Sequence, residues 1–376
     1  MTVVVQRPIP YNMNKFFAPI LFSVLILSAC TTSKDSLPSS SGMIGDIILI
    51  MDSTQWKGPL GKTVDSLFSV ETEGLPRPEA VFHLKWVDPR KLNSVLKQRR
   101  NLIFAVTLDQ KSSGAATVKR LFTKESLDQI RANPDLFSRN STDVFSKGQE
   151  VLYLFSTTEK QLIEHIRKNG KRLIEHFDIR ERERLSSTLF KSKQMKGVSQ
   201  ILKKELQCDI KIPFGYELVM SNEEFFWTRQ MTATDDKDIF IARKKYTSQD
   251  QFKRDSLIKW RDAICEKYLF GDPDRSETHL MTETTIPFKP VITREISFNK
   301  KFAVEMRGLW KTYNLVMGGP FLSYTLADPA NGMMYYIEGF TISPGRPQRE
   351  IMRELETILY TFKISGELVE KEAVGR

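Results

Sequence analysis

Apolar segments alternate with helical segments between residues 46 and 155, and this alternation constrains the fold more than any other feature of the sequence. Short apolar segments rich in β-branched residues are typical of buried strands, whereas apolar residues every three or four positions are typical of helices. Strands are expected at 46–51, 80–87, 102–108 and 151–155, and helices at 60–70 and 89–100. This order predicts an α/β sandwich, for which a ferredoxin-like arrangement is one candidate.

Residues 159–206 form a basic helical region, after which the pattern becomes that of an α+β domain. The region has thirteen Lys or Arg residues against seven Asp or Glu residues. Beyond it, strands are expected at 209–219, 224–231, 238–245, 281–286, 293–298, 301–309, 322–327 and 333–342, and helices at 248–269 and 348–360. The chain is therefore expected to be an α+β protein with two sandwich-like domains, 46–206 and 207–376.

A turn near the start of the second domain carries a likeness to a known fold type. Pro213-Phe-Gly-Tyr216 resembles the Pro-x-Gly-aromatic turn with which folds of the PsbP and Mog1 type often open. The resemblance implies an antiparallel sheet covered by helices for residues 207–376. It is a likeness of fold alone, so it implies no function.

The first 29 residues have the pattern of a secretory signal peptide. Lys15 gives a positive start, residues 16–27 form an apolar segment of twelve residues, and Ser-Ala precedes Cys30. The apolar segment is too short to cross a bilayer. Its ending resembles the bacterial lipobox, so we expect Cys30 to be lipidated; an ordinary cleaved signal followed by a chance cysteine is the alternative. Met13 is the expected translation start.

Residues 30–45 are expected to form a flexible tether because Ser, Thr, Pro and Gly dominate them. Thr31, in place of Asp, favours the outer membrane, and a single acidic residue, Asp35, favours the periplasmic face. The expected location is thus the cell envelope, through an N-terminal lipid such as palmitate. Because export separates the chain from DNA, its net charge of +10 does not predict nucleic-acid binding. A solvated basic helix face attracted to anionic headgroups is the preferred interpretation.

Three motifs for bound ions or nucleotides are incomplete. Trp56 stands where a phosphate loop needs its first glycine. His165 and His176 are three helical turns apart, about 16 Å along a helix axis and too far for one ion. Glu277 stands where a calcium loop starting at Asp272 needs glycine. No metal and no cofactor are therefore expected.

Two cysteines and three aspartates have simple structural interpretations. Cys208 and Cys265 form either a disulfide, which an oxidising periplasm would allow, or two buried free thiols, the default. Asp235, Asp236 and Asp238 are expected at the solvated tip of a hairpin.

The most distinctive segments are Arg307-Gly-Leu-Trp310 and Met317-Gly-Gly-Pro-Phe321. Arginine and tryptophan are enriched at interfaces, and glycines permit close backbone approach. Arg307, Trp310, Gly318 and Gly319 are therefore a candidate interaction patch. The alternative is structural, with glycines at bends and Trp310 in the core.

Several motifs together resemble a family of uncharacterised Bacteroidota lipoproteins, domain of unknown function 4837. The likeness spans nearly the whole mature chain and rests on the strand 46–51 with Trp56, Ile212-Pro-Phe-Gly-Tyr216, Phe226-Trp-Thr-Arg229, Arg307-Gly-Leu-Trp310, Met317-Gly-Gly-Pro-Phe321 and residues 353–359. The resemblance supports lipidation of Cys30 and implies no activity.

The expected function is that of a non-enzymatic binding or accessory module, anchored by its lipid and contacting an envelope protein or a small ligand. No motif of nucleophilic or metal-dependent catalysis is found in the sequence. The alternative is an envelope hydrolase whose active site is assembled from His83, His279 and acidic residues.

Overall fold

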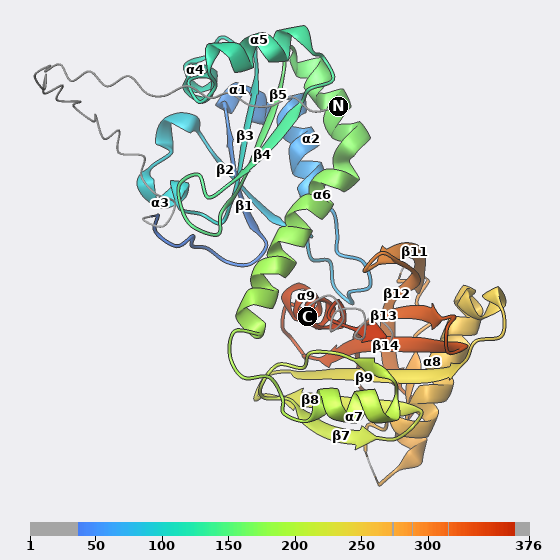
Figure 1. Ribbon diagram of the computed structural model, residues 1–376. Coiled ribbons are helices and arrows are strands. Elements are labelled where there is room, and N and C mark those ends of the chain that lie inside the picture. The colour runs from blue at the N-terminus through green and yellow to red at the C-terminus, as the bar shows by residue number, and fades with distance from the viewer. Residues whose placement is uncertain (1–36, 273, 288, 315, 365–376) are drawn as a thin grey trace, which may run out of the picture.

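The computed structural model describes residues 37–364 except 273, 288 and 315, and it arranges them around two large β-sheets joined by the long helix α6 (Figure 1). We call the five-stranded sheet with its helices the first domain, and the eight-stranded sheet with its helices the second domain. The expected signal peptide, Cys30 and the start of the tether lie outside the described residues. The predicted α+β class is confirmed.

The first domain has a mainly parallel sheet in the order β2-β1-β3-β5-β4. Its strands are β1 (Asp46–Met51), β2 (His83–Val87), β3 (Asn101–Thr107), β4 (Ser138–Thr142) and β5 (Glu150–Ser156). Only β4 is antiparallel to its neighbour. The ferredoxin-like arrangement considered from the sequence is therefore wrong, because that fold has an antiparallel sheet. Parallel strands covered on both faces also explain the uninterrupted apolar sequence of β1.

Helices cover both faces of this sheet. They are α1 (Ser53–Lys57), α2 (Pro59–Phe68), the 3-10 helix η2 (Pro89–Lys91), α3 (Ser94–Lys97), α4 (Ser113–Lys119), α5 (Lys124–Ala132) and α6 (Glu159–Leu189). Side chains of α2 and α6 pack on one face, and those of α4 and α5 pack on the other. The single helix expected at 89–100 is wrong, because Asn93 starts a new helix there by accepting a 2.9 Å hydrogen bond from the Leu96 amide.

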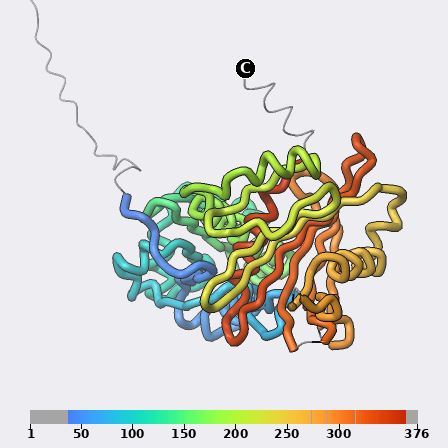
Figure 2. Tube along the Cα trace, turned by 90° about the horizontal axis from the view of Figure 1, so that it is seen from below, coloured from blue at the N-terminus to red at the C-terminus, as the bar shows by residue number. Residues whose placement is uncertain are grey.

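The second domain has an antiparallel sheet in the order β10-β12-β13-β14-β9-β8-β7, with β11 also paired to β12. Figure 2 shows its yellow and red strands, β9 and β14, side by side. The strands are β7 (Glu217–Ser221), β8 (Phe225–Met231), β9 (Asp236–Lys245), β10 (Leu280–Thr282), β11 (Ile292–Phe298), β12 (Lys301–Thr312), β13 (Gly318–Asp328) and β14 (Met333–Ile342). A two-stranded sheet pairs β6 (Cys208–Asp209) with β15 (Lys363–Ile364).

Each face of the second sheet carries its own apolar core. One core includes α7 (Val198–Glu205) and α9 (Arg349–Leu359), and the other includes α8 (Arg254–Tyr268), which follows the 3-10 helix η3 (Gln249–Phe252). A further 3-10 helix, η4 (Ser276–Thr278), precedes β10. Cys208 lies in the first core and Cys265 in the second, and both are free buried thiols. Across the described residues, no helix is long and apolar enough to cross a membrane.

Candidate functional site

The second domain carries an open groove of about 1030 Å³ between η3 and the β11–β12 hairpin. Pockets of this size commonly hold small molecules, and they are mostly lined by apolar and aromatic side chains. Three rings supply its apolar wall: the Tyr246 and Phe252 rings have centroids 6.0 Å apart, and the Phe252 and Phe302 rings are 5.2 Å apart in an edge-to-face contact. Phe302 remains 52% exposed, so its ring is available to a ligand.

Local turn chemistry places these rings. Ser248 and Gln251 form a capping box that starts η3 and sets the position of Phe252. Asn299 and Lys300 have φ values of 48° and 70°, which form the tight turn between β11 and β12. Phe302 is the second residue of β12 after that turn, and its side chain lines the groove.

Charged side chains surround the aromatic wall in nearly balanced numbers. Lys253, Arg294 and Lys301 line the groove together with Asp250 and Glu295. The Lys253 ammonium lies 2.7 Å from the Asp250 carboxylate, and Arg294 pairs with Glu73 of the first domain. This lining suits an amphipathic ligand with an apolar body and a polar end.

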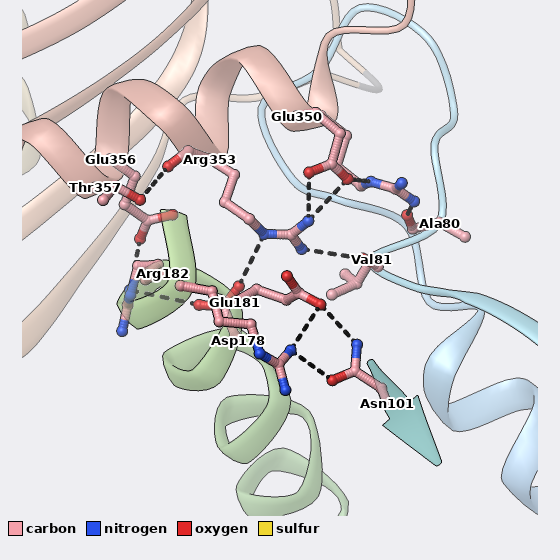
Figure 3. Close-up of polar contacts among 12 residues, drawn as sticks. Ala80, Val81, Asn101, Asp178, Glu181, Arg182, Glu350, Arg353, Glu356 and Thr357 are labelled. Carbon is pink, nitrogen blue, oxygen red and sulfur yellow. Dashed lines mark hydrogen bonds and ion pairs between the residues drawn. The ribbon is translucent and has the colours of Figure 1, made fainter. Parts of the chain in front are cut away.

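A second polar site lies between the two domains, where α6 meets α9 (Figure 3). We call Asp178, Arg182, Glu350, Arg353 and Glu356 the interdomain cluster. The Arg353 guanidinium donates to Glu350 at 2.8 Å and 2.9 Å, lies 3.4 Å from an Asp178 carboxylate oxygen, and donates to the Val81 carbonyl at 3.2 Å. Each of these contacts except the Glu350 pair joins α9 to the first domain.

Glu356 is the carboxylate of this cluster that contacts three different side chains through one oxygen. Its Oε1 accepts from Arg182 at 3.1 Å, from Arg307 at 3.0 Å and from the Tyr324 hydroxyl at 3.0 Å. Burial by itself raises the pKa of Glu356, but the guanidinium groups of Arg307 and Arg182 outweigh burial and lower that pKa. The carboxylate is therefore held ionised as a counter-ion between the domains, which is a structural role.

The start of α9 is also held by the first domain. Both oxygens of the Glu79 carboxylate accept backbone amides there, at 2.7 Å from Gln348 and 2.9 Å from Arg349. An acidic group at a helix N-terminus satisfies free amides and favourably meets the helix dipole. The two domains are therefore joined by polar contacts, and we infer that the interdomain cluster holds them together.

A third polar group is enclosed between α8 and the sheet. Arg261 and Glu338 are both 0% exposed, and their closest contacts are 2.8 Å and 2.9 Å. The Tyr336 hydroxyl donates to the same carboxylate at 2.5 Å, and the Arg261 guanidinium lies 4.1 Å from the centre of the Phe321 ring. Burial raises the pKa of Glu338. With no opening to solvent at either side chain, this pair has no access to a substrate.

Asp238 lies in strand β9 and is fully buried, so its expected place at a solvated hairpin tip is wrong. Its Oδ1 accepts from the Trp227 indole at 2.9 Å and from the Arg229 guanidinium at 3.0 Å. Burial raises the pKa of Asp238 to about 6. Sequence reasoning missed this contact because the aspartate is next to charged residues in the sequence.

The candidate interaction patch does not form one exposed surface. Trp310 is 1% exposed and packs edge-to-face on Phe340. The Arg307 guanidinium is engaged by Glu305, at 3.0 Å, and by Glu356. A Cβ at Gly319 would lie 2.1 Å from the Thr341 carbonyl oxygen, and one at Gly318 would lie 2.7 Å from the Trp310 carbonyl oxygen. The structural alternative holds for these residues, and the patch prediction is wrong.

The histidines are dispersed. His83 lies 3.6 Å from Asp46 in the first domain, whereas His279 stacks on Tyr313 in the second. The convergence of His83 with His279 that the alternative hydrolase would need is therefore not found. His176 contacts Glu150 at 2.8 Å, and His165 stacks on Phe137. Among the described residues, no three His, Cys, Asp or Glu side chains converge to hold a metal ion.

Trp56, at the incomplete phosphate-loop motif, and the loop after α8, at the incomplete calcium-loop motif, make contacts within the fold. Trp56 stacks on Trp86 with ring centroids 5.9 Å apart. It lies in the short helix α1, and a Cβ at Gly61 would clash with its backbone. In the loop after α8, Asp272 accepts the Asp274 amide at 3.1 Å, which is the geometry of an Asx turn.

Comparisons with known families cover both halves of the chain. Residues 195–361 match the family described as "Domain of unknown function (DUF4837)", and residues 40–190 match the family described as "Domain of unknown function (DUF8532)". The resemblance to domain 4837 is thus confirmed for the second half, whereas the first half matches a different family. No curated protein matches the chain.

Solved structures match part of the chain at low similarity. The Ran-binding protein Mog1p of Saccharomyces cerevisiae is 7% identical with a TM-score of 0.29, and the match covers 46% of this chain and 95% of that chain. A STAR-related lipid transfer protein of Xanthomonas axonopodis is 14% identical with a TM-score of 0.20, covering 39% and 94%. Mog1, the fold type named from the sequence, is therefore among the matches, but likenesses this weak carry no functional conclusion.

Proposed function

We propose that this chain is a lipid-anchored cell-envelope protein that binds a small amphipathic ligand in the groove of its second domain without transforming it. The groove is the observation that carries the proposal. It combines a volume of about 1030 Å³ with a wall of three rings and a polar rim. The anchor is supported by the sequence alone, through the apolar segment 16–27 and the Ser-Ala-Cys ending at Cys30.

The proposed location is the periplasmic face of the outer membrane. Thr31, in place of Asp, supports the outer membrane, and the nearly uncharged tether supports the periplasmic face. An anchored binding module needs a ligand site on its folded part and a flexible connection to its lipid. The groove supports the first feature. The Ser and Thr content of residues 31–37 supports the second from the sequence alone, because residues 38–41 are hydrogen-bonded to the first domain.

The groove is tested by removing one ring of its wall. Anilinonaphthalene sulfonate, an amphipathic fluorophore, should bind the native chain, and Phe302→Ser should weaken that binding about tenfold because a ring burying apolar surface is lost. Fluorescence titration measures the dissociation constant. Tyr313→Ser is the matched control, because Tyr313 is 60% exposed and lies outside the groove. Equal affinity of the Phe302→Ser and native chains would overturn the groove proposal.

The anchor is tested at Cys30. Cys30→Ser should abolish incorporation of labelled palmitate, because serine offers no thiol for the lipid, and should move most of the chain from the membrane pellet to the salt-washed supernatant. A single acyl chain contributes about 0.8 kcal/mol per buried methylene group, so its loss is a large effect. Full palmitate labelling of the Cys30→Ser variant would contradict lipidation at this residue.

A further inference from the structure

Two segments of the second domain form one continuous basic surface. Residues 191–197 connect α6 to α7, and residues 211–217 form the turn before β7. They run side by side: Gln194 and Pro213 form an antiparallel bridge, and the Met195 amide donates to the Ile212 carbonyl at 3.0 Å. Both segments line one shallow hollow of about 400 Å³. We call these two segments the lysine-rich surface.

The charge of the lysine-rich surface is strongly positive. It contains Lys191, Lys193, Lys196 and Lys211, and its one carboxylate is that of Glu217. All four lysines are exposed. No ion pair joins any of them to another side chain in the described part of the chain. The four cations are therefore available to an anionic partner.

An aromatic ring projects from the middle of this surface. Phe214 is 71% exposed, although the flanking Pro213 and Tyr216 are buried. Gly215 has a φ of 97°, which turns the chain sharply after Phe214. The buried neighbours fix the turn, so the exposed ring is held at its tip.

Strand β7, which follows the turn, also exposes apolar side chains. Leu218, Val219 and Met220 of β7 are 38%, 45% and 38% exposed. β7 is the last strand of its sheet, and Figure 1 shows it on the side of the second domain away from the first. Exposed apolar groups of this kind, gathered on one part of a surface, mark an interaction site.

We propose that the lysine-rich surface binds an anionic lipid bilayer, with the Phe214 ring in the boundary between headgroups and acyl chains. Segments that bind membrane interfaces combine basic residues with exposed aromatic and aliphatic side chains in this way. Each lysine near an anionic membrane contributes an attraction that falls off within the screening length of the salt solution. The unpaired lysines beside Phe214 favour an anionic bilayer over an apolar protein partner.

This contact does not depend on the lipid at Cys30 or on the groove. The surface belongs to the second domain, whereas the tether leads into the first domain through residues that pair with Lys147 and Arg99. A lipid would hold the chain near the membrane, and the lysine-rich surface would then determine which side of the second domain faces the bilayer.

The experiment is cosedimentation with vesicles, using the chain from residue 31 onward. This chain lacks the lipid site but contains every residue that the structure describes. Vesicles of phosphatidylcholine with roughly 30% phosphatidylglycerol should bind it in a salt-sensitive manner, whereas vesicles of phosphatidylcholine alone should bind it weakly. Lys193→Gln with Lys196→Gln should weaken binding about 25-fold, at about fivefold per lysine. Phe214→Ser should weaken it about tenfold.

Control variants make the same types of substitution at other positions. They show whether the loss of vesicle binding depends on where the lysines and the ring lie. Lys124→Gln with Lys160→Gln removes two exposed lysines from the first domain, and Tyr313→Ser removes a ring that is 60% exposed and lies outside both the groove and the lysine-rich surface. Both controls should bind vesicles as the native chain does. Equal binding to the two vesicle types, or equal losses in the controls, would overturn the proposal. Self-association through β7 without vesicle binding, measured by sedimentation equilibrium, would also overturn it and assign the surface to a second copy of the chain.

Discussion

Replacing Arg261 by Met should lower the free energy of unfolding by about 3–5 kcal/mol, because the Glu338 carboxylate would remain buried without its counter-ion. Both side chains are 0% exposed, and two guanidinium nitrogens contact the carboxylate at 2.8 Å and 2.9 Å. The loss also removes the guanidinium from the Phe321 ring, 4.1 Å away. Urea unfolding at neutral pH, followed by circular dichroism, measures the effect.

The double variant Arg261→Met with Glu338→Leu separates the cost of an unpaired charge from the cost of lost packing. Apolar replacement of a whole buried ion pair is often neutral or stabilising, so the double variant should regain most of the stability that Arg261→Met loses. Burial already raises the pKa of Glu338 in the native chain. The single variant should therefore be less destabilised at acidic pH, where Glu338 takes up a proton. A loss in the double variant larger than that in the single variant would refute this account.

Replacing Arg353 by Met should lower the free energy of unfolding by about 1.5–3 kcal/mol and should uncouple the two domains. The loss is smaller than at Arg261, because Glu350 and Asp178 are 32% and 25% exposed and keep Arg349 and Arg182 as partners. Arg353 is 5% exposed and is the residue of α9 that contacts Asp178 of α6 and the Val81 carbonyl (Figure 3). The substitution removes the guanidinium that donates hydrogen bonds to Glu350, Asp178 and the Val81 carbonyl. Unfolding in urea should then show two separate transitions.

Arg131→Met is the control for this experiment. Arg131 pairs with Asp128 at 2.6 Å, but both side chains are 57% exposed, so the pair contributes less than about 1 kcal/mol. Tryptophan fluorescence and circular dichroism should report one shared transition for the control and separate transitions for Arg353→Met. A single transition with an unchanged midpoint in Arg353→Met would show that the interdomain cluster does not couple the domains.

Much of the secondary structure follows from local sequence patterns. The strands expected at 46–51 and 333–342 match β1 and β14 to the residue, and the final helix differs by one residue at each end. These segments combine a clear apolar pattern with adjacent turn residues. Residues 113–142 yielded no expectation, although they form α4, α5 and β4. Their helices bury only Gly114, Ala115, Val118 and Ile130, so their apolar periodicity is weak.

The groove could not be predicted, because its wall combines rings from segments that are remote in the sequence. Tyr246 precedes η3, Phe252 is the last residue of η3, and Phe302 follows the β11–β12 turn. Their sequence patterns resemble those of ordinary core residues. The candidate patch failed for the opposite reason: Trp310 and the glycines were conspicuous in the sequence, yet they serve close packing between β12, β13 and β14.

The sequence by itself determined the α+β class, most strands and helices, and the pattern at Cys30 that predicts a lipid anchor. These depend on local periodicity, turn chemistry and a short linear motif. Only the tertiary structure decided which charges are buried. Arg261 and Glu338 are 77 residues apart, and Asp178 and Arg353 are 175 residues apart. The packing of helices against a sheet brings these charged side chains together. A local sequence pattern does not show which residues far apart in the chain will meet.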